Sequence, residues 1–429
     1  MPIVLPSICF NVALLPHELN KKMRDIADIF DIIILFMLRF LISLLFSMSV
    51  YANSDNFGEF LQGIRIQAIE IGVSEKTLDA ALNNLTPNQQ ILNFDRSQAE
   101  FSQHFWHYIN SRVSQYRIEK GSVALLNNKQ LLSQIYKQYG VPPHIVVSFW
   151  GLETNYGNNT GRYNLIRSLA TLSFDKRRSG FFTKQLLSLL KLIDDGKIPI
   201  NSNGSWAGAM GNMQFMPTNV EYYAIDADED GKLGLWNSKP DILASAANFL
   251  KKIGWHRAEK WGREVIIPVN FNYQLANLRT KKTVDSWNGL GVTDANGDEL
   301  PSSSMMSSVL LPMGYKGPAF LVYRNFSAIL NWNRSILYAL SVGYLSDRLA
   351  GMNELTATPI DEPLLDRDNI INIQTSLNKL GFDAGIADGI SGPKTRTATR
   401  DFQLNNGLPA DGYVGQQLLI QLRSEGNGD

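Results

Sequence analysis

Residues 148–157 read Ser148-Phe149-Trp150-Gly151-Leu152-Glu153-Thr154-Asn155-Tyr156-Gly157. They follow Pro142 and Pro143, which suit a helix start because they lack N–H groups that would be unpaired there. Residues 144–152 are nearly all apolar, so we predict a helix that runs through a protein core. A charged side chain on such a helix is costly unless it is paired or functional. Glu153 is therefore our first candidate for chemistry.

The position of Glu153 also affects its acidity. The C-terminal end of a helix carries partial negative charge, and this charge and the apolar neighbours both raise the pKa of a carboxyl. A carboxyl that stays neutral near pH 7 can donate a proton. The alternative is structural: Glu153 caps a neighbour or pairs with an arginine such as Arg162 or Arg167. The helix alone does not separate the two interpretations.

Length and composition limit the number of domains and the kinds of partner that we expect. The 429 residues are enough for two or three domains, and the formal net charge is zero. A net charge of zero gives no indication of a nucleic-acid partner or an electrostatic membrane anchor. The single cysteine, Cys9, lies in a segment that we expect to be absent from the mature protein. The mature chain then has no disulfide, so its stability depends on core packing.

The N-terminal region has the pattern of a secretory signal peptide. Met37-Leu38-Arg39 precedes the apolar run 40–50, and Val50 and Ala52 stand where small residues mark a cleavage site. We predict that translation starts at Met37, that residues 1–52 are leader and signal, and that the mature protein is exported. The less favoured alternative is a membrane anchor over residues 32–50.

A second stretch is rich in small residues. Residues 204–217 contain three glycines and two alanines beside Trp206, Ser205 and Gln214. Small residues allow close approach of the backbone to a helix or to a ligand. We favour the wall of a cleft, in which Ser205 and Gln214 hold a polar substrate, over a tight helix contact.

An acidic loop follows at residues 226–241. Its start has the D-x-D-x-D-G pattern of a calcium-binding EF-hand loop, with Gly231 at the turn. Asn237 stands where an EF-hand places its bidentate Glu. The predicted ligands all offer oxygen atoms: Asp226, Asp228, Asp230, the carbonyl of Lys232, and Asp241. An acidic turn cluster without metal is the alternative.

The rest of the chain reads as mainly α, because few stretches alternate as strands do. Apolar spacing predicts helices over residues 56–85, 101–116, 125–139, 165–172, 181–194, 241–253 and 335–349. We predict that residues 265–314 are irregular apart from short strands at 264–270 and 308–311. Trp332, Asn333 and Tyr338 either present aromatic faces and an amide to a sugar ring or pack at a helix start.

Residues 352–363 form a predicted linker to a small module at 364–425. The module holds a weak repeat, since Asp388-Gly389-Ile390-Ser391-Gly392 resembles Asp411-Gly412-Tyr413-Val414-Gly415. A predicted helix follows each copy, over 393–405 and 416–423. A module of this size, near the lower limit for independent folding, suits binding more than catalysis.

These segments resemble, in order, the lytic murein transglycosylase B family. The resemblance rests on residues 151–157, on residues 205–217, on the acidic loop and on residues 325–338, and it spans roughly residues 57–351. The module resembles the peptidoglycan-binding-like domain of three helices, through Gln374, Asp388-Gly389, Gln403 and Asp411-Gly412. The resemblance implies a lysozyme-like catalytic domain over 53–351. From the predicted signal peptide, which ends near Ala52, we expect a periplasmic location.

The resemblance also implies the chemistry and the site residues. It implies cleavage of glycan strands between N-acetylmuramic acid and N-acetylglucosamine, with Glu153 as the sole acid and base and a 1,6-anhydromuramyl product. It implies that five residues contact substrate: Ser205, Gln214, Trp332, Asn333 and Tyr338. No cofactor is expected for the reaction, only a structural Ca²⁺ in the acidic loop. Peptidoglycan is the expected partner of a monomeric protein, with no nucleic acid.

Two other functions remain open at this point. Ordinary glycoside hydrolysis uses two carboxyls, so a hydrolysing muramidase would need a second one, such as Asp175. A non-catalytic protein that binds the cell wall and scaffolds other enzymes is the alternative from a different class.

Overall fold

The computed structural model describes residues 57–97, 104–360 and 362–426. The predicted signal peptide, the start at Met37, Cys9 and the alternative anchor over 32–50 lie outside these residues. The chain divides into two compact units after Gly63, and the described part of the first is the start of α2 (Phe57–Glu70). No helix within the described residues is long and apolar enough to cross a bilayer.

The prediction of a mainly α protein is confirmed. The helices before and including the one that carries Glu153 are α3 (Glu75–Leu82), α4 (Gln89–Ser97), α5 (Phe105–Arg112), α6 (Gln115–Asn127), α7 (Lys129–Tyr139) and α8 (Pro143–Thr154). The helices after it are α9 (Leu165–Phe174), α10 (Ser179–Asp194), α11 (Pro217–Tyr223), α12 (Lys239–Lys252), α13 (Val284–Asn288), α14 (Arg324–Trp332) and α15 (Ile336–Leu349).

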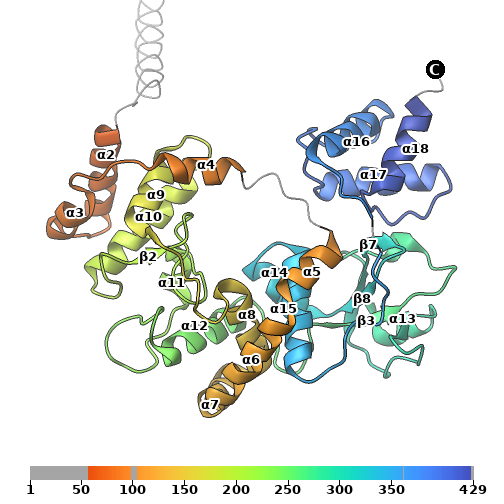
Figure 1. The fold of residues 1–429 in the computed structure, drawn as a ribbon, viewed down its shortest axis with the longest axis horizontal. Coiled ribbons are helices and arrows are strands. Elements are labelled where there is room, and N and C mark those ends of the chain that lie inside the picture. The colour runs from red at the N-terminus through yellow and green to blue at the C-terminus, as the bar shows by residue number, and fades with distance from the viewer. Residues whose placement is uncertain (1–56, 98–103, 361, 427–429) are drawn as a thin grey trace, which may run out of the picture. The chain divides into compact units, whose positions relative to one another are not determined.

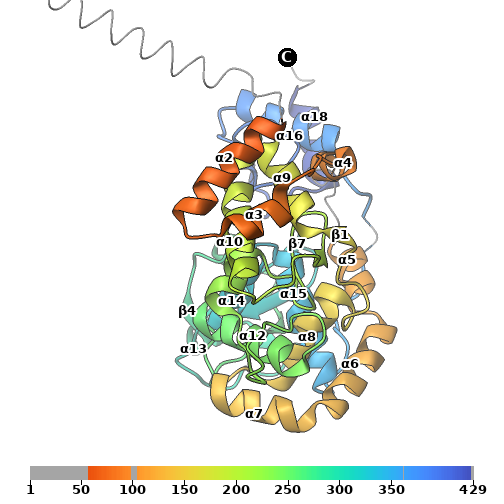
Figure 2. The ribbon, with the colours of Figure 1, turned by 90° about the vertical axis from the view of Figure 1, so that its left-hand side faces the viewer.

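Helix α8, which carries Glu153, is surrounded by other helices. Pro142 is its N-cap and Pro143 its first residue, as the sequence predicted, and nearly every residue from Ile145 to Leu152 is buried. It contacts α6, α7, α12 and α15, and Figure 2 shows it among these helices. An apolar helix surrounded in this way is stable only because its neighbours remove all its faces from water.

Three predicted helices have other boundaries in the structure. The expected helix 56–85 is two helices, because Gly72 has a positive φ of 81° and Ser74 caps the start of α3. The expected helix 125–139 is interrupted at Asn128, whose side-chain amide donates to the carbonyl of Ala124 at the end of α6. Ser114 caps the start of α6, so the helix expected over 101–116 ends before residue 116. In each case a local cap overrides the apolar spacing.

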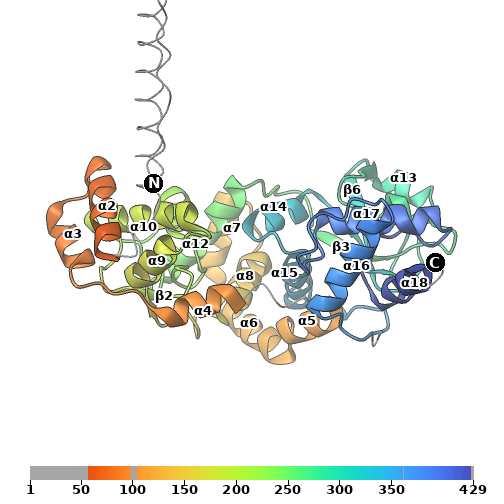
Figure 3. The ribbon, with the colours of Figure 1, turned by 90° about the horizontal axis from the view of Figure 1, so that it is seen from above.

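Residues 204–217 approach α9, which runs side by side with α10 (Figure 3). Strand β1 (Tyr163–Asn164) pairs with β2 (Asn203–Gly204) and brings this segment next to the start of α9. A Cβ at Gly208 would lie 2.3 Å from Leu169 of α9. The glycines therefore allow close packing, which was the alternative considered for this stretch.

The region 265–314 is more regular than predicted: the expected short strands at 264–270 and 308–311 correspond to strands Gly262–Ile266 and Met306–Leu310, and the other strands were not predicted. A five-stranded antiparallel sheet has the order β4-β6-β8-β3-β5. Its strands and the neighbouring β7 are β3 (Gly262–Ile266), β4 (Lys282–Thr283), β5 (Thr293–Asp294), β6 (Met306–Leu310), β7 (Pro312–Tyr315) and β8 (Ala319–Val322). Two strands have only two residues, and β8 is buried along its whole length. Neither kind produces the alternation by which a strand is recognised.

The C-terminal module consists of α16 (Arg367–Lys379), α17 (Pro393–Asn405) and α18 (Gln416–Gly426), which share one apolar core (Figure 1). The weak sequence repeat is a structural repeat. Gln374 donates to Asp388 at 3.1 Å and accepts from the amide of Gly389. Gln403 donates to Asp411 at 2.9 Å and accepts from the amide of Gly412. Each copy thus joins a helix to the Asp-Gly turn that follows it.

Candidate active site

The carboxyl of Glu153 lies at the C-terminal end of α8, as predicted. Asn155 and Tyr156 follow with positive φ of 52° and 61°, and the amide of Tyr156 donates to the carbonyl of Trp150. Non-glycine residues in this backbone region are strained, and such strain concentrates at functional sites. The turn stops the helix just after Glu153 and leaves this side chain half-buried.

Two side chains from a distant part of the chain hold one oxygen of Glu153. The indole Nε1 of Trp332 donates to Oε1 at 2.9 Å, and the hydroxyl of Tyr338 donates to the same atom at 2.5 Å. Trp332 is the last residue of α14, and Tyr338 lies in the first turn of α15. With Oε1 occupied twice, Oε2 is the atom available for proton transfer.

Burial raises the pKa of Glu153, while the hydrogen bonds from Tyr338 and Trp332 and the charge of Arg112 lower it by less. The pKa of Tyr338 is also raised, by burial first and then by the nearby Glu153. A carboxyl with a raised pKa holds its proton closer to neutral pH. The site therefore has the electrostatics of a general acid, and burial, one of the two causes that the sequence suggested, accounts for the raised pKa.

Tyr108 and Arg112 of α5 also belong to this site, and the sequence did not single them out. The guanidinium carbon of Arg112 lies 5.3 Å from the ring centre of Tyr108. Burial raises the pKa of Tyr108, Arg112 lowers it, and Glu153 raises it. The aromatic content of this segment was the only sequence signal, and it did not identify these residues, because their neighbours are distant in the chain.

The predicted substrate residues Trp332 and Asn333 have different surroundings. The ring of Trp332 packs against Phe149 and Phe249, with ring centres 4.5 Å and 4.7 Å away. Asn333 is exposed, and its side-chain oxygen accepts from the amide of Ser335. Trp332 therefore packs against core residues, as the alternative proposed, but at the end of α14 and not at a helix start, and it also contacts Glu153.

Ser205 and Gln214 both contact the backbone of their own segment. The hydroxyl of Ser205 accepts from the amide of Ala209 at 2.9 Å. Gln214 has a positive φ of 48°, and its amide nitrogen donates to the carbonyls of Gly211 and Thr160. These bonds fix the orientation of the Gln214 side chain and leave its Oε1 available as an acceptor.

Asn212 ties the small-residue segment to α8, which the sequence analysis did not foresee. Its side-chain oxygen accepts from Trp150 Nε1 at 2.7 Å, and its amide nitrogen donates to the carbonyls of Leu235 and Trp236. Its own carbonyl accepts from the hydroxyl of Thr154. One buried residue therefore joins α8, the 204–217 segment and the acidic loop.

The arginines proposed as partners of Glu153 are engaged elsewhere. Arg167 donates to Thr86 and Pro87, and the guanidinium of Arg162 lies over the ring of Tyr163. Asp175 accepts from the amide of Arg177 and pairs with Arg96 at 3.5 Å. Among the described residues, none of the groups that shift the pKa of Glu153 is a second carboxyl.

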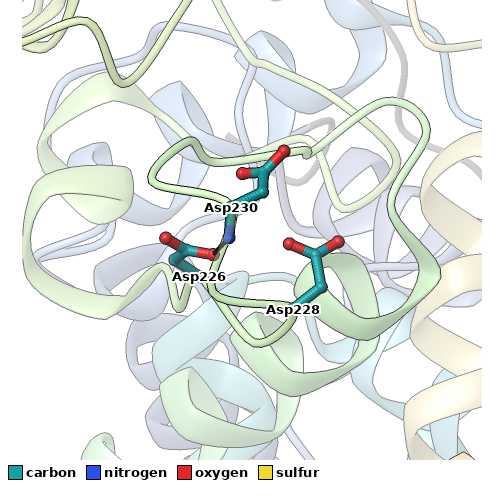
Figure 4. Close-up of side chains that lie close together, drawn as sticks. All are labelled: Asp226, Asp228 and Asp230. Atoms are coloured by element: carbon teal, nitrogen blue, oxygen red, sulfur yellow. Dashed lines mark hydrogen bonds between the residues drawn. The ribbon is translucent and has the colours of Figure 1, made fainter.

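The acidic loop brings three of its predicted ligands together. Figure 4 shows the carboxylates of Asp226, Asp228 and Asp230 close to one another, and their oxygens lie within 4.8 Å of each other. Gly231 has a positive φ of 86°, as the turn of an EF-hand requires. Three hard oxygen donors at this spacing fit a calcium ion.

Asp241 occupies a different place from the other three. It is fully buried at the start of α12. One of its oxygens accepts from the amide of Ala227 at 2.7 Å, and the other accepts from the amide of Gly234 at 2.7 Å. These bonds engage both oxygens of Asp241, the predicted distal ligand, and hold both ends of the loop.

Comparison with protein families agrees with this geometry. Residues 56–347 match a family model described as a transglycosylase SLT domain. The chain belongs to the transglycosylase SLT domain family. A second model, described as a putative peptidoglycan binding domain, matches residues 366–422.

Characterised members of the family give the class of enzyme. The chain is 29% identical over 313 residues to membrane-bound lytic murein transglycosylase B of Escherichia coli (strain K12), over 70% of this chain and 84% of that protein. Since its relatives are lytic murein transglycosylases, this SLT-domain protein is an enzyme of that class, a lyase that acts on peptidoglycan.

Solved structures of the family are similar as well. SltB3 from Pseudomonas aeruginosa, solved in complexes with NAG-anhNAM-pentapeptide and NAG-NAM-pentapeptide, is 42% identical with a TM-score of 0.83; the match covers 86% of this chain and 100% of that chain. Slt35 from Escherichia coli in complex with calcium is 28% identical with a TM-score of 0.59, over 69% of this chain and 93% of that chain.

Proposed function

We propose that this lytic transglycosylase cleaves the β-1,4 bond between N-acetylmuramic acid and N-acetylglucosamine and forms a 1,6-anhydromuramyl end, with Glu153 as the only general acid and base. One observation carries the proposal. Glu153 is a half-buried carboxyl with a raised pKa, and two donors hold its Oε1. The complex of the similar SltB3 with NAG-anhNAM-pentapeptide supports an anhydro product.

The reaction needs only one carboxyl because it consumes no water. Oε2 of Glu153 gives its proton to the glycosidic oxygen as the bond to the muramyl C1 breaks. The acetamido group of the substrate stabilises the developing positive charge. The carboxylate then removes the proton of the muramyl C6 hydroxyl, whose oxygen bonds to C1. An attacking group that is already part of the substrate has a high effective concentration.

Trp332 and Tyr338 keep the carboxyl oriented through both proton transfers. Their bonds to Oε1 also stabilise the carboxylate after it has lost its proton. We further propose that Oε1 of Gln214 and the exposed amide of Asn333 accept and donate hydrogen bonds to the sugar. Ser205 contacts the sugar as well, and its hydroxyl also accepts from the amide of Ala209.

The remaining parts have supporting roles in this proposal. Residues 53–351 form the catalytic region, 352–363 the linker, and 364–425 a module that holds the enzyme on the cell wall. The protein acts as a monomer in the periplasm. Asp226, Asp228, Asp230 and the carbonyl of Lys232 hold a structural Ca²⁺, and Asp241 keeps their loop closed. The calcium complex of Slt35 supports this site.

Mass analysis of the products from purified sacculi tests the reaction. Anhydro-muropeptides are the expected products. Products heavier by one water would contradict the proposal and indicate a hydrolysing muramidase. Glu153→Gln should lower turnover by roughly 10²–10⁴-fold while wall binding is kept, and near-normal activity would refute the assignment. Wall binding without any released product by the wild type would instead indicate a scaffold.

A further inference from the structure

An apolar groove lies between α6, α7 and the ends of α8 and α15, and the reaction proposed above gives it no role. It encloses about 530 Å³. Leucines from three helices and one lysine line most of it: Leu125, Leu126, Lys129, Leu132 and Leu349. An open groove with this lining on a protein surface indicates an interaction site.

The groove is separate from the catalytic carboxyl. Pro143 lines it at the first residue of α8, whereas Glu153 is ten residues further on, about 15 Å along the helix axis. Leu349, at the end of α15, lines the groove, while Tyr338, at its start, contacts Glu153. The same two helices therefore carry the groove at one end and the catalytic site at the other.

Exposed apolar side chains extend the groove along α6. Tyr116 is 52% exposed, Val123 53% and Leu126 72%. Their spacing of seven and three residues places them on one side of the helix. Tyr136 of α7 lines the groove and is also exposed. An aligned set of apolar side chains facing water is unusual for a surface without a partner.

This surface is also strongly basic, although the whole chain is neutral. Residues 115–139 and 251–260 together contain eight lysines and arginines and two glutamates. The two segments are in contact, since Lys251 donates to the carbonyl of Gln138 and Arg257 donates to the carbonyls of Tyr136 and Lys137. One of the glutamates, Glu259, pairs with His256. Most of the positive charge here is therefore not balanced locally.

We propose that this surface, which consists of α6, α7 and residues 251–260, binds an anionic phospholipid bilayer. Leu126 and Val123 enter the head-group layer beside the groove, and Lys129 and Lys137 contact lipid phosphates. Exposed lysines beside tyrosines and leucines are typical of membrane-surface binding. Lysine is instead depleted at interfaces between proteins, which favours the bilayer over a protein partner.

Vesicle binding by the purified protein tests this proposal. We expect sedimentation with vesicles of phosphatidylethanolamine and phosphatidylglycerol, little with phosphatidylcholine vesicles, and release in about 1 M salt, where charges are screened beyond about 3 Å. Lys129→Glu with Lys137→Glu should weaken binding at least about tenfold. Leu126→Asn should weaken it while leaving its salt dependence in place.

Matched variants control for charge and surface polarity. Lys281→Glu with Lys379→Glu changes the same number of exposed lysines elsewhere, and Leu404→Asn changes another exposed leucine. These controls should bind anionic vesicles as the wild type does. Equal binding by the test and control variants, or equal binding to neutral vesicles, would overturn the proposal. So would self-association without lipid that Leu126→Asn abolishes, because the face would then bind a second copy.

Discussion

The indole nitrogen of Trp332 lies 2.9 Å from Oε1 of Glu153, although 179 residues separate them in the chain. This contact joins the end of α14 to the end of α8. It makes Trp332 part of the immediate surroundings of the Glu153 carboxyl, whose pKa this hydrogen bond lowers. The neighbouring hydroxyl of Tyr338 does the same from the start of α15.

Replacing Tyr338 tests this tuning. Its hydrogen bond lowers the pKa of Glu153, so Tyr338→Phe should raise that pKa further. The acid form of Glu153 then persists to higher pH, and the alkaline limb of the pH–rate profile should move upward. We also expect kcat to fall about tenfold, because the carboxyl loses one orienting bond. The pH dependence of muropeptide release measures both effects.

Tyr344 provides the matched control on the same helix. It lies six residues after Tyr338 in α15, and Tyr344→Phe removes the same hydroxyl away from Glu153. This variant should keep the wild-type pH profile. An unchanged profile for Tyr338→Phe as well would mean that the bond to Oε1 has no part in catalysis.

Asn212→Ala should destabilise the catalytic region. The change removes three buried hydrogen bonds of the side chain and leaves Trp150 Nε1 without its acceptor. Unsatisfied buried groups cost about 1–3 kcal/mol each, so we expect a loss of about 2–4 kcal/mol in the free energy of unfolding. Urea denaturation measures it. A loss below about 1 kcal/mol would show that the three contacts are not coupled through this residue.

Asp347 makes stability depend on pH. It is held by Trp261, whose Nε1 lies 3.1 Å and 3.2 Å from its two oxygens. Burial raises its pKa from 3.8 to about 6. The folded state therefore holds this proton more tightly than the unfolded state. Stability from this group is fully present below about pH 4 and is lost as the pH rises to about 6.

Asp347→Asn should remove that dependence. The amide oxygen can still accept from Trp261, and the variant carries no charge to bury. It should therefore be more stable than the wild type at pH 8, by about 1–3 kcal/mol, and similar at pH 4. Asp298→Asn, at an exposed site, is the control for removing one charge. Equal stability of Asp347→Asn and the wild type at both pH values would contradict the assignment.

Two aspartates of the acidic loop have different expected roles, Asp230 in metal binding and Asp241 in the folding of the loop. Calcium should raise the Tm of the wild type, and Asp230→Asn should reduce that rise because it removes one ligand charge. Asp241→Asn should instead lower the Tm with and without calcium, since Asp241 accepts backbone amides at both ends of the loop. Thermal unfolding with added calcium and with a chelator compares them. Identical behaviour of the two variants would contradict this division of roles.

Local signals in the sequence located some elements well. The prolines and the apolar run predicted α8, and with it the position of Glu153. The predicted helix 393–405 matches α17. Of the five-stranded sheet, only the strands near 264–270 and 308–311 were predicted, since its shortest strands have two residues and pair with neighbours far along the chain. Alternation can be recognised only over longer strands.

In the site, too, features that depend on neighbouring residues were predicted and contacts between distant residues were not. The residue types of Asp226, Asp228 and Asp230 predicted a cluster, because a short loop brings alternate positions together. The roles of Tyr108, Arg112 and Asn212 could not be predicted. Each acts on a group that is 40 or more residues away, and a periodic pattern contains no information about such pairs.

Residues that are close together in the chain were enough to indicate the enzyme class, the candidate glutamate, the acidic loop and the C-terminal module. The surroundings of Glu153 and the distribution of charge on the surface depend on the folded chain. A chain with zero net charge acquires a basic face when α7 packs against the end of α12. Acidity and surface charge depend on distances through space, which folding alone sets.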